Sequence, residues 1–166
     1  MWRSGLSKVV RPGMTLAAAF LALFALSGMV VPAASEDNPG AAASKAHLED
    51  GKAALADRAY DIAVLQFERA ITTDPRNARA FAWLGFAHQE AGNPDKALKY
   101  YRLALDIDPG DVKALLWNGQ MDVEGKNLEA ARDKLQRMAR VCTRKCEEYR
   151  TLENSIRMMT ARLEHQ

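Results

Sequence analysis

A repeat with a period of about 34 residues constrains this chain more than any other feature. Its clearest copy occupies residues 78–111, and shifted copies lie on both sides of it. The positions that recur, given for the clearest copy and then for its neighbours, are Gly85 (Gly51 and Gly119), Ala97 (Ala63 and Ala131), Tyr101 (Phe67 and Leu135), Ala104 (Ala70) and Pro109 (Pro75). A sustained period of this length predicts an all-α solenoid in which each copy is one helix–turn–helix unit.

Turn and stop signals divide each unit into two helices. The apolar periodicity is interrupted at residues 57–59, 91–94 and 125–127, and turns are expected there. Asp-Pro pairs at 74–75 and 108–109 end the second helices of the first two units, because proline disfavours the helical state in the residue before it. We therefore expect six helices in three antiparallel pairs, the first beginning at Lys45.

A seventh helix is expected from about Cys146, after the third unit ends at Cys142-Thr143. Its apolar residues advance by three and four positions, while Glu and Arg occupy the opposite side. This apolar stripe consists of Tyr149, Leu152, Ile156, Met159 and Leu163. One apolar face and one polar face are typical of a helix that caps the last repeat of a solenoid.

The repeated residues resemble those of tetratricopeptide repeats. The central copy carries a nearly complete set, namely Phe81, Leu84, Gly85, Ala97, Tyr101, Ala104 and Pro109. The resemblance implies a right-handed helical solenoid of three repeats, at 44–77, 78–111 and 112–143, with a C-terminal capping helix at 144–166. The first copy departs from the pattern at His47 and Asp50, and the third lacks the proline.

Small side chains are expected where the two helices of a unit approach each other. Gly51, Gly85 and Gly119 should face the alanines of the second helices, which are Ala63, Ala97 and Ala131. Phe67, Tyr101 and Leu135 should then fill the space between successive units. Each unit alone exposes an apolar face, and stacking buries it.

The segment from Met1 to Ala33 has the three parts of a signal peptide. A basic stretch with Arg3, Lys8 and Arg11 precedes an uncharged apolar run at 14–31, and Val31-Pro32-Ala33 offers small residues for cleavage after Ala33. We expect a cleaved signal peptide and a periplasmic protein; the alternative is a membrane anchor retained at 14–31. Residues 34–44 are predicted to be a flexible linker.

The charge balance argues against nucleic acid as a partner. The segment from Met1 to Ala33 contains three of the 23 basic residues and none of the 21 acidic residues, so the chain without it is close to neutral. The basic excess therefore belongs to the leader. With the leader removed, we expect no stable insertion into a membrane.

The candidate binding surface is the part of each first helix that core packing does not use. In the tetratricopeptide family this helix faces a concave groove. The candidate groove residues are Lys45, Leu48, Lys52, Arg79, Trp83, Phe86, Gln89, Lys113, Leu116, Trp117 and Gln120. The family implies a peptide or protein ligand, and the aromatic strip with flanking basic residues suits a peptide with apolar anchors and some acid.

Two alternatives for this surface stay open. One of the two tryptophans, Trp83 or Trp117, packs on the cap or on a neighbouring unit instead of facing a ligand. The basic ladder of Lys45, Arg79 and Lys113 is simply a solvated face. The surface does not match the dicarboxylate clamp of the chaperone-binding members, whose Lys and Asn residues are replaced by Leu48, Lys52, Trp83 and Trp117; we therefore predict a different class of partner.

The two cysteines, Cys142 and Cys146, lie outside the repeat pattern. In an exported protein such a pair indicates a disulfide, here between the last repeat helix and the cap. Redox activity and metal binding are weaker alternatives, since the spacing is not Cys-x-x-Cys and further ligands are missing. The element from Cys142 to Tyr149, Cys-x3-Cys-Glu-Glu-Tyr, also resembles the ending of small exported proteobacterial repeat proteins.

No constellation of residues predicts catalysis. His47, His88 and His165 are scattered, and the sequence shows no phosphate-binding loop or EF-hand pattern. His88 is expected in the packing between helices. We therefore predict a non-enzymatic module without cofactor or metal, although Asp106, Asp108 and Asp111 leave a weak cation site as an alternative.

The functional hypothesis is an exported adaptor or assembly factor that binds a peptide or partner protein in its groove. The alternative is a structural subunit of an envelope complex that docks through its convex face or its cap helix, without a peptide ligand. A monomer or a weak homodimer is expected, since the poorly matching first copy could pair with another chain.

Overall fold

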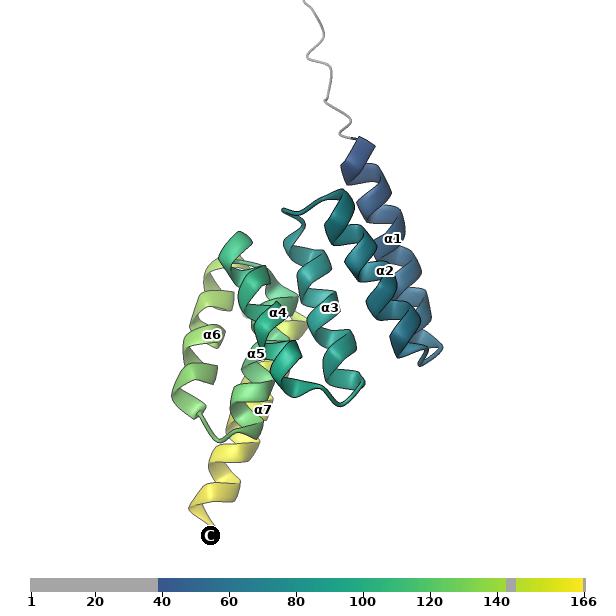
Figure 1. Ribbon diagram of the computed structural model, residues 1–166. Helices are drawn as coiled ribbons and strands as arrows, with labels where there is room; N and C mark the ends of the chain where they lie inside the picture. Colours follow the sequence, from purple (N-terminus) through teal and green to yellow (C-terminus); the bar gives the residue numbers. More distant parts are fainter. Residues whose placement is uncertain (1–38, 143–145, 166) are drawn as a thin grey trace, which may run out of the picture. The chain divides into compact units, whose positions relative to one another are not determined.

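The computed structural model describes residues 39–142 and 146–165. The predicted signal peptide and residues 34–38 of the predicted linker lie outside this part of the chain. The described part contains helices and no strand, and Figure 1 shows the helices paired in chain order. They are α1 (Pro39–Ala56), α2 (Tyr60–Thr73), α3 (Ala78–Glu90), α4 (Pro94–Ile107), α5 (Val112–Glu124), α6 (Leu128–Val141) and α7 (Glu147–Glu164).

The helix boundaries agree with the predicted ones to within one residue, except at the start of α1. Side-chain caps begin two of the first helices, because Asn77 accepts a hydrogen bond from the Ala80 amide at 3.1 Å and Asp111 accepts one from the Ala114 amide at 2.8 Å. Each turn between paired helices also contains one residue with positive φ, at equivalent positions of the three repeats. These residues are Arg58 (57°), Gly92 (77°) and Lys126 (60°).

Helix α1 begins at Pro39, so the prediction of a flexible linker is wrong for residues 39–44. Ser44 explains the difference. Its side chain is fully buried, its hydroxyl donates a hydrogen bond to the Ala70 carbonyl oxygen at 2.8 Å, and it accepts one from the Asn77 side-chain amide at 2.9 Å. These bonds fix the first turns of α1 to α2 and α3, although the local sequence has no apolar stripe.

Glycines allow the close helix contacts that the repeat pattern predicts. A Cβ on Gly85 would lie 2.7 Å from Cδ1 of Tyr101 and 3.1 Å from the Ala97 carbonyl oxygen. A Cβ on Gly119 would lie 2.8 Å from Cδ2 of Leu152, which belongs to α7. In the third repeat the capping helix thus supplies the side chain nearest to the glycine, while Leu135 is half-buried against the same core cluster.

Aromatic side chains fill the space between successive repeats, as predicted for Phe67 and Tyr101. The Phe67 ring lies 6.2 Å from the Trp83 ring, and the equivalent Tyr101 ring lies 6.2 Å from the Trp117 ring. The same contact thus joins the first repeat to the second and the second to the third, as expected for a solenoid.

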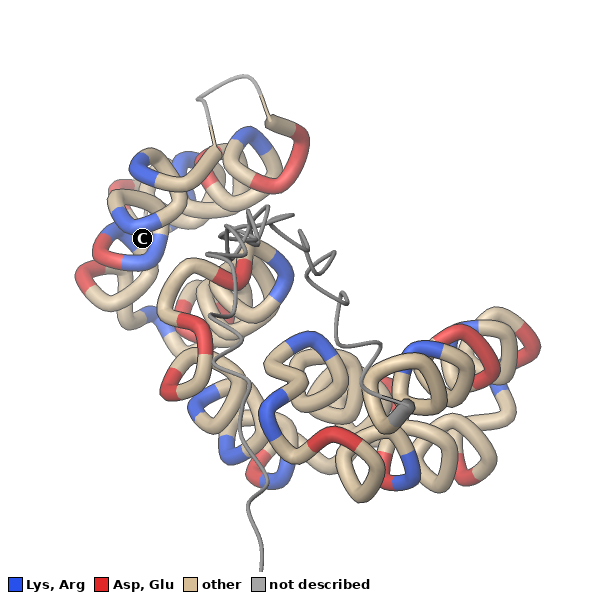
Figure 2. Tube along the Cα trace, turned by 90° about the horizontal axis from the view of Figure 1, so that it is seen from above, with Lys and Arg blue, Asp and Glu red and all other residues tan. Residues whose placement is uncertain are grey.

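Helix α7 closes the last repeat by packing against α5 and α6. Tyr149, Leu152 and Ile156 of its predicted stripe are buried, whereas Met159 and Leu163 are half-buried. Lys and Arg lie close to Asp and Glu along the helices of all three repeats (Figure 2). Within residues 39–142 and 146–165, no helix has the length and apolar character needed to cross a membrane.

Candidate functional site

An aromatic cluster of Trp83, Phe86 and Trp117 joins the first helices α3 and α5. The Trp83 and Trp117 ring centroids are 4.9 Å apart, and the Phe86 ring lies 4.6 Å from Trp117 and 5.9 Å from Trp83. The three side chains are therefore mutual neighbours, as the repeat register predicts.

Three of the candidate groove residues are buried. Leu48 is 4% exposed, Leu116 7% and Trp117 8%. Trp117 is enclosed by the rings of Trp83, Phe86 and Tyr101, so of the two alternatives for this side chain the packing one holds. The prediction that these three side chains are open to a ligand is wrong, because they are buried in the core between successive repeats.

The other aromatic and amide candidates are half-buried: Trp83, Phe86, Gln89 and Gln120. Gln89 is held in place by the Tyr101 hydroxyl, which donates a hydrogen bond to its Oε1 at 2.7 Å. Burial raises the pKa of Tyr101, so this hydroxyl stays a donor over the physiological range. No sequence pattern indicated this bond, since it joins residues on two helices.

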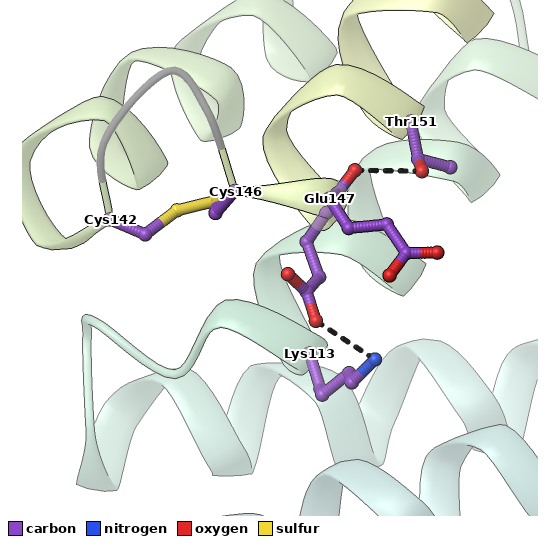
Figure 3. Close-up of a disulfide and its surroundings, with 6 residues drawn as sticks. Lys113, Cys142, Cys146, Glu147 and Thr151 are labelled. Carbon is purple, nitrogen blue, oxygen red and sulfur yellow. Dashed lines mark hydrogen bonds and ion pairs between the residues drawn. A yellow bond between two sulfur atoms is a disulfide. The ribbon is translucent and has the colours of Figure 1, made fainter.

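Two of the candidate lysines are already engaged. Lys52 pairs with Glu49 at 2.8 Å and lies over the Trp83 ring at 5.3 Å, and its hydrogen bond lowers the pKa of the Glu49 carboxyl. Lys113 pairs with Glu148 at 3.0 Å and lies 5.9 Å from the Trp117 ring. Figure 3 shows Lys113 beneath the start of the cap helix, with this ion pair dashed.

Lys45 and Arg79 differ from these lysines. Both are exposed, and neither forms an ion pair with another residue in the part of the chain that the structure describes. They line one cavity of about 560 Å³, which we call the α1–α3 cavity, with Leu48 and Glu49 beside them. Of the predicted basic ladder, Lys45 and Arg79 therefore line this cavity, whereas Lys113 does not.

Carboxylates from the turns after α2 and α4 also line the α1–α3 cavity, but they already accept hydrogen bonds from backbone amides. Asp74 accepts a hydrogen bond from the Arg76 amide at 3.1 Å, and Asp108 accepts one from the Gly110 amide at 2.9 Å. Asp111 caps α5, and burial raises the pKa of its carboxyl. The Asp-Pro pairs marked these positions as helix ends, and the sequence did not indicate that they would meet at a cavity.

The cysteine side chains meet at the junction of α6 and α7. The structure places the Cys142 and Cys146 sulfur atoms within bonding distance (Figure 3), and their Cα atoms are 6.1 Å apart. This separation lies within the range found for disulfides.

Two of the three histidines take part in packing or hydrogen bonding within the described residues. His88 is buried and stacks on Tyr100, with ring centroids 5.3 Å apart, and Nδ1 of His47 lies at hydrogen-bond distance, 3.0 Å, from Oε1 of Gln66. Across residues 39–142 and 146–165, no group of three His, Cys, Asp or Glu side chains is placed to hold a metal ion. The absence of catalysis stays a prediction.

Solved structures of tetratricopeptide domains share this fold. PilF of Pseudomonas aeruginosa matches with a TM-score of 0.68 and 22% identity, covering 76% of this chain and 56% of that one. The first such domain of Spaghetti (RPAP3), solved with the HSP90 peptide SRMEEVD, matches with a TM-score of 0.66 and 18% identity, covering 75% of this chain and 98% of that one.

A curated relative and two family models agree with these structures. The small glutamine-rich tetratricopeptide repeat-containing protein 2 of Saccharomyces cerevisiae is 45% identical over 49 residues, which are 30% of this chain and only 14% of that protein. Models described as tetratricopeptide repeat match residues 48–112 and 88–156. Together the two matches cover more than half of the chain, which belongs to the tetratricopeptide repeat family.

Proposed function

We propose that this protein is an exported interaction module that holds an acidic peptide segment of a partner protein. The observation that carries the proposal is the α1–α3 cavity, in which Lys45 and Arg79 lack ion pairs with other described residues. Glu49 and Asp111 lie close enough to interact electrostatically with these cations, and a carboxylate from a ligand would supply the direct ion pair that they lack.

The neighbouring surface supplies an apolar contact for the same ligand. Lys52 follows Leu48 by about one turn of α1 and lies over Trp83, which is only half-buried and contacts Phe86. Trp83 and Phe86 therefore offer the apolar anchor site, and the buried Trp117 ring packs against both of them. Peptide binding has precedent in the family, because the RPAP3 domain was solved with an HSP90 peptide.

A paired charge reversal tests this assignment. We expect Lys45→Glu together with Arg79→Glu to abolish capture of the partner from an envelope fraction. The matched control is Arg132→Glu with Arg140→Glu, which makes the same charge change at exposed residues of α6. Equal recovery of the same partner by both double variants would show that the α1–α3 cavity does not bind it.

The role of an adaptor or assembly factor in the periplasm rests on the leader and on the cysteine pair. Cleavage after Ala33 and a bond between Cys142 and Cys146 both give definite masses in the exported protein. We expect the intact mass of the chain from Ala34, two hydrogens lighter than its reduced form. A mass that includes residues 1–33 would favour the membrane anchor instead.

Docking through the outer helices is the second candidate, and the exposed apolar residues of α2 favour it. Ile62 is 55% exposed and Leu65 46%, whereas the equivalent positions of the second repeat are Lys96 and Lys99. Apolar side chains at such positions mark a contact surface more often than charged ones do. If Ile62→Lys with Leu65→Lys releases a captured partner and the charge reversal at Lys45 and Arg79 does not, the protein is a structural subunit.

A further inference from the structure

A second cavity, of about 360 Å³, lies where α5 is flanked by α4 and α6, and we call it the α4–α6 cavity. It shares no residue with the α1–α3 cavity or with the candidate groove. Its polar lining residues are Arg102, Asp106, Asn118, Asp122, Lys134 and Arg137. The α4–α6 cavity is therefore a site distinct from the proposed groove.

The equivalent place between the first and second repeats is filled with apolar and aromatic side chains. Leu84, which corresponds to Asn118, is 1% exposed. His88 and Tyr100, which correspond to Asp122 and Lys134, stack on each other. The second and third repeats thus have a polar cavity at the place where the first and second repeats have a packed core.

Asn118 has a buried side-chain amide to which the described part of the fold gives no hydrogen-bond partner. It is 6% exposed, and its side chain makes no hydrogen bond to any residue in the described part of the chain. No fully enclosed side-chain nitrogen or oxygen of the described residues lacks a partner, so the Asn118 amide must be open to the cavity. A buried amide is normally hydrogen-bonded, and this one has only the contents of the cavity to bond to.

Three basic and two acidic side chains line the cavity around Asn118. Lys134 pairs with Asp122 at 2.5 Å, and the Arg137 guanidinium donates a hydrogen bond to the Pro109 carbonyl oxygen at 2.9 Å. Arg102 and Asp106, about one turn apart on α4, are both exposed, and neither has an ion pair with another described residue. The side chains at this site whose donors have no partner among the described residues are therefore Arg102 and Asn118.

We propose that the α4–α6 cavity binds a carboxylate. Both oxygens accept hydrogen bonds from Arg102, whose planar fork matches a carboxylate, and one of them also accepts a hydrogen bond from the Asn118 amide. Leu98 and Leu105 line the same cavity and contact the methylene groups that carry the carboxylate. The ligand is either a small free acid or an acidic side chain of a bound protein, since both present the same group.

Side-chain amide resonances of the ¹⁵N-labelled protein test the proposal directly. The probes are N-acetylglutamate amide and its uncharged isostere, N-acetylglutamine amide. We expect a saturable shift of the Asn118 side-chain NH₂ signals with the first probe and at most a tenth of it with the second. No saturable shift, or equal shifts with both probes, would overturn the proposal.

Succinate and acetate, added as further probes, distinguish the two sources of the carboxylate. If either saturates the site at a tenfold lower concentration than N-acetylglutamate amide, the natural ligand is a free acid. If the capped residue binds at least as tightly, the ligand is an acidic side chain of a partner. Both outcomes require the carboxylate site, and failure of binding at the α1–α3 cavity affects neither.

Two variants separate binding from folding. Arg102→Gln should weaken binding of N-acetylglutamate amide at least tenfold, while Arg140→Gln, at an exposed position outside the cavity, should leave it unchanged. Asn118→Leu restores the residue type of the central repeat, so it should raise the melting temperature while removing binding. Unaltered binding in Arg102→Gln or Asn118→Leu would contradict the assignment.

Discussion

The two junctions between repeats are formed by equivalent helices but are filled with different kinds of side chain. Between the first and second repeats, Leu84 is enclosed and His88 stacks on Tyr100. Between the second and third, Asn118 lies at a cavity and Asp122 pairs with Lys134. The stacking of these repeats therefore does not depend on an apolar filling at this position.

A contact that the two junctions share explains why this position can hold either apolar or polar side chains. In both, an aromatic residue of the second helix contacts a tryptophan of the next repeat, Phe67 with Trp83 and Tyr101 with Trp117. These contacts lie among fully buried alanines that let the helices approach closely. The helix spacing is fixed there, so the neighbouring position is free to contribute either stability or a binding site.

The largest expected effect is that of placing the polar residue of the second junction in the first. Leu84→Asn removes a buried leucine and leaves an amide without a partner, and should lower the free energy of unfolding by about 3–5 kcal/mol. Urea denaturation followed by circular dichroism measures the change. The control is Leu65→Asn, at a half-exposed position of α2, which should cost well under about 1 kcal/mol.

A loss below about 1 kcal/mol in Leu84→Asn would remove the distinction between the junctions. The first junction would then accept a polar residue as readily as the second does. The cavity at Asn118 would be an accident of packing, and its residues would need no ligand to account for them.

The repeat period alone was enough to predict the helices, because the close contacts that define a repeat lie within one unit. Gly85 meets Tyr101 and Ala97 only a few turns along the chain, so the pattern is visible in the sequence. The start of α1 escaped prediction, because hydrogen bonds of Ser44 to residues of other helices define it.

The candidate site was less predictable, because exposure depends on neighbours from other repeats. Trp83 and Trp117 occupy equivalent positions, yet only Trp117 is buried, between Phe86 and Tyr101. The α1–α3 cavity likewise depends on turn residues that the sequence marks only as helix ends, such as Asp108. Side-chain types at regular spacing indicate a shared face, but they do not say which members of it stay open.

The third repeat, which has the polar junction, is also where the predicted disulfide would join the last repeat helix to the cap. Cys142→Ser with Cys146→Ser should lower the free energy of unfolding by about 2 kcal/mol, the value expected for closing so short a loop. Urea denaturation of the exported protein and of the double variant measures it. Because Tyr149, Leu152 and Ile156 stay buried against the last repeat, the variant should keep its helix content at low urea.

Reduction of the unaltered protein is the matched control, since it breaks the same bond without a substitution. It should reproduce the loss seen in the double variant. If neither treatment changes the stability, the contacts of Tyr149, Leu152 and Ile156 hold the cap without help from the cysteines.

The smallest expected effect concerns the stacked histidine of the first junction. Burial lowers the pKa of His88 below 6.5, and Lys96 adds to this while Glu68 opposes it. The unfolded chain therefore takes up a proton before the folded one does. Stability from this residue is complete above about pH 7 and decreases as the pH falls through 6.5 toward the lower pKa of the folded state.

His88→Phe keeps an aromatic ring against Tyr100 and removes the titrating group. Urea midpoints at pH 7.5 and pH 5.5 should differ less in this variant than in the parent protein. The equivalent change at the exposed His165 should leave the parent's pH dependence unaltered. If His88→Phe retains the full dependence, another group titrates, and the aromatic filling of the first junction contributes only packing.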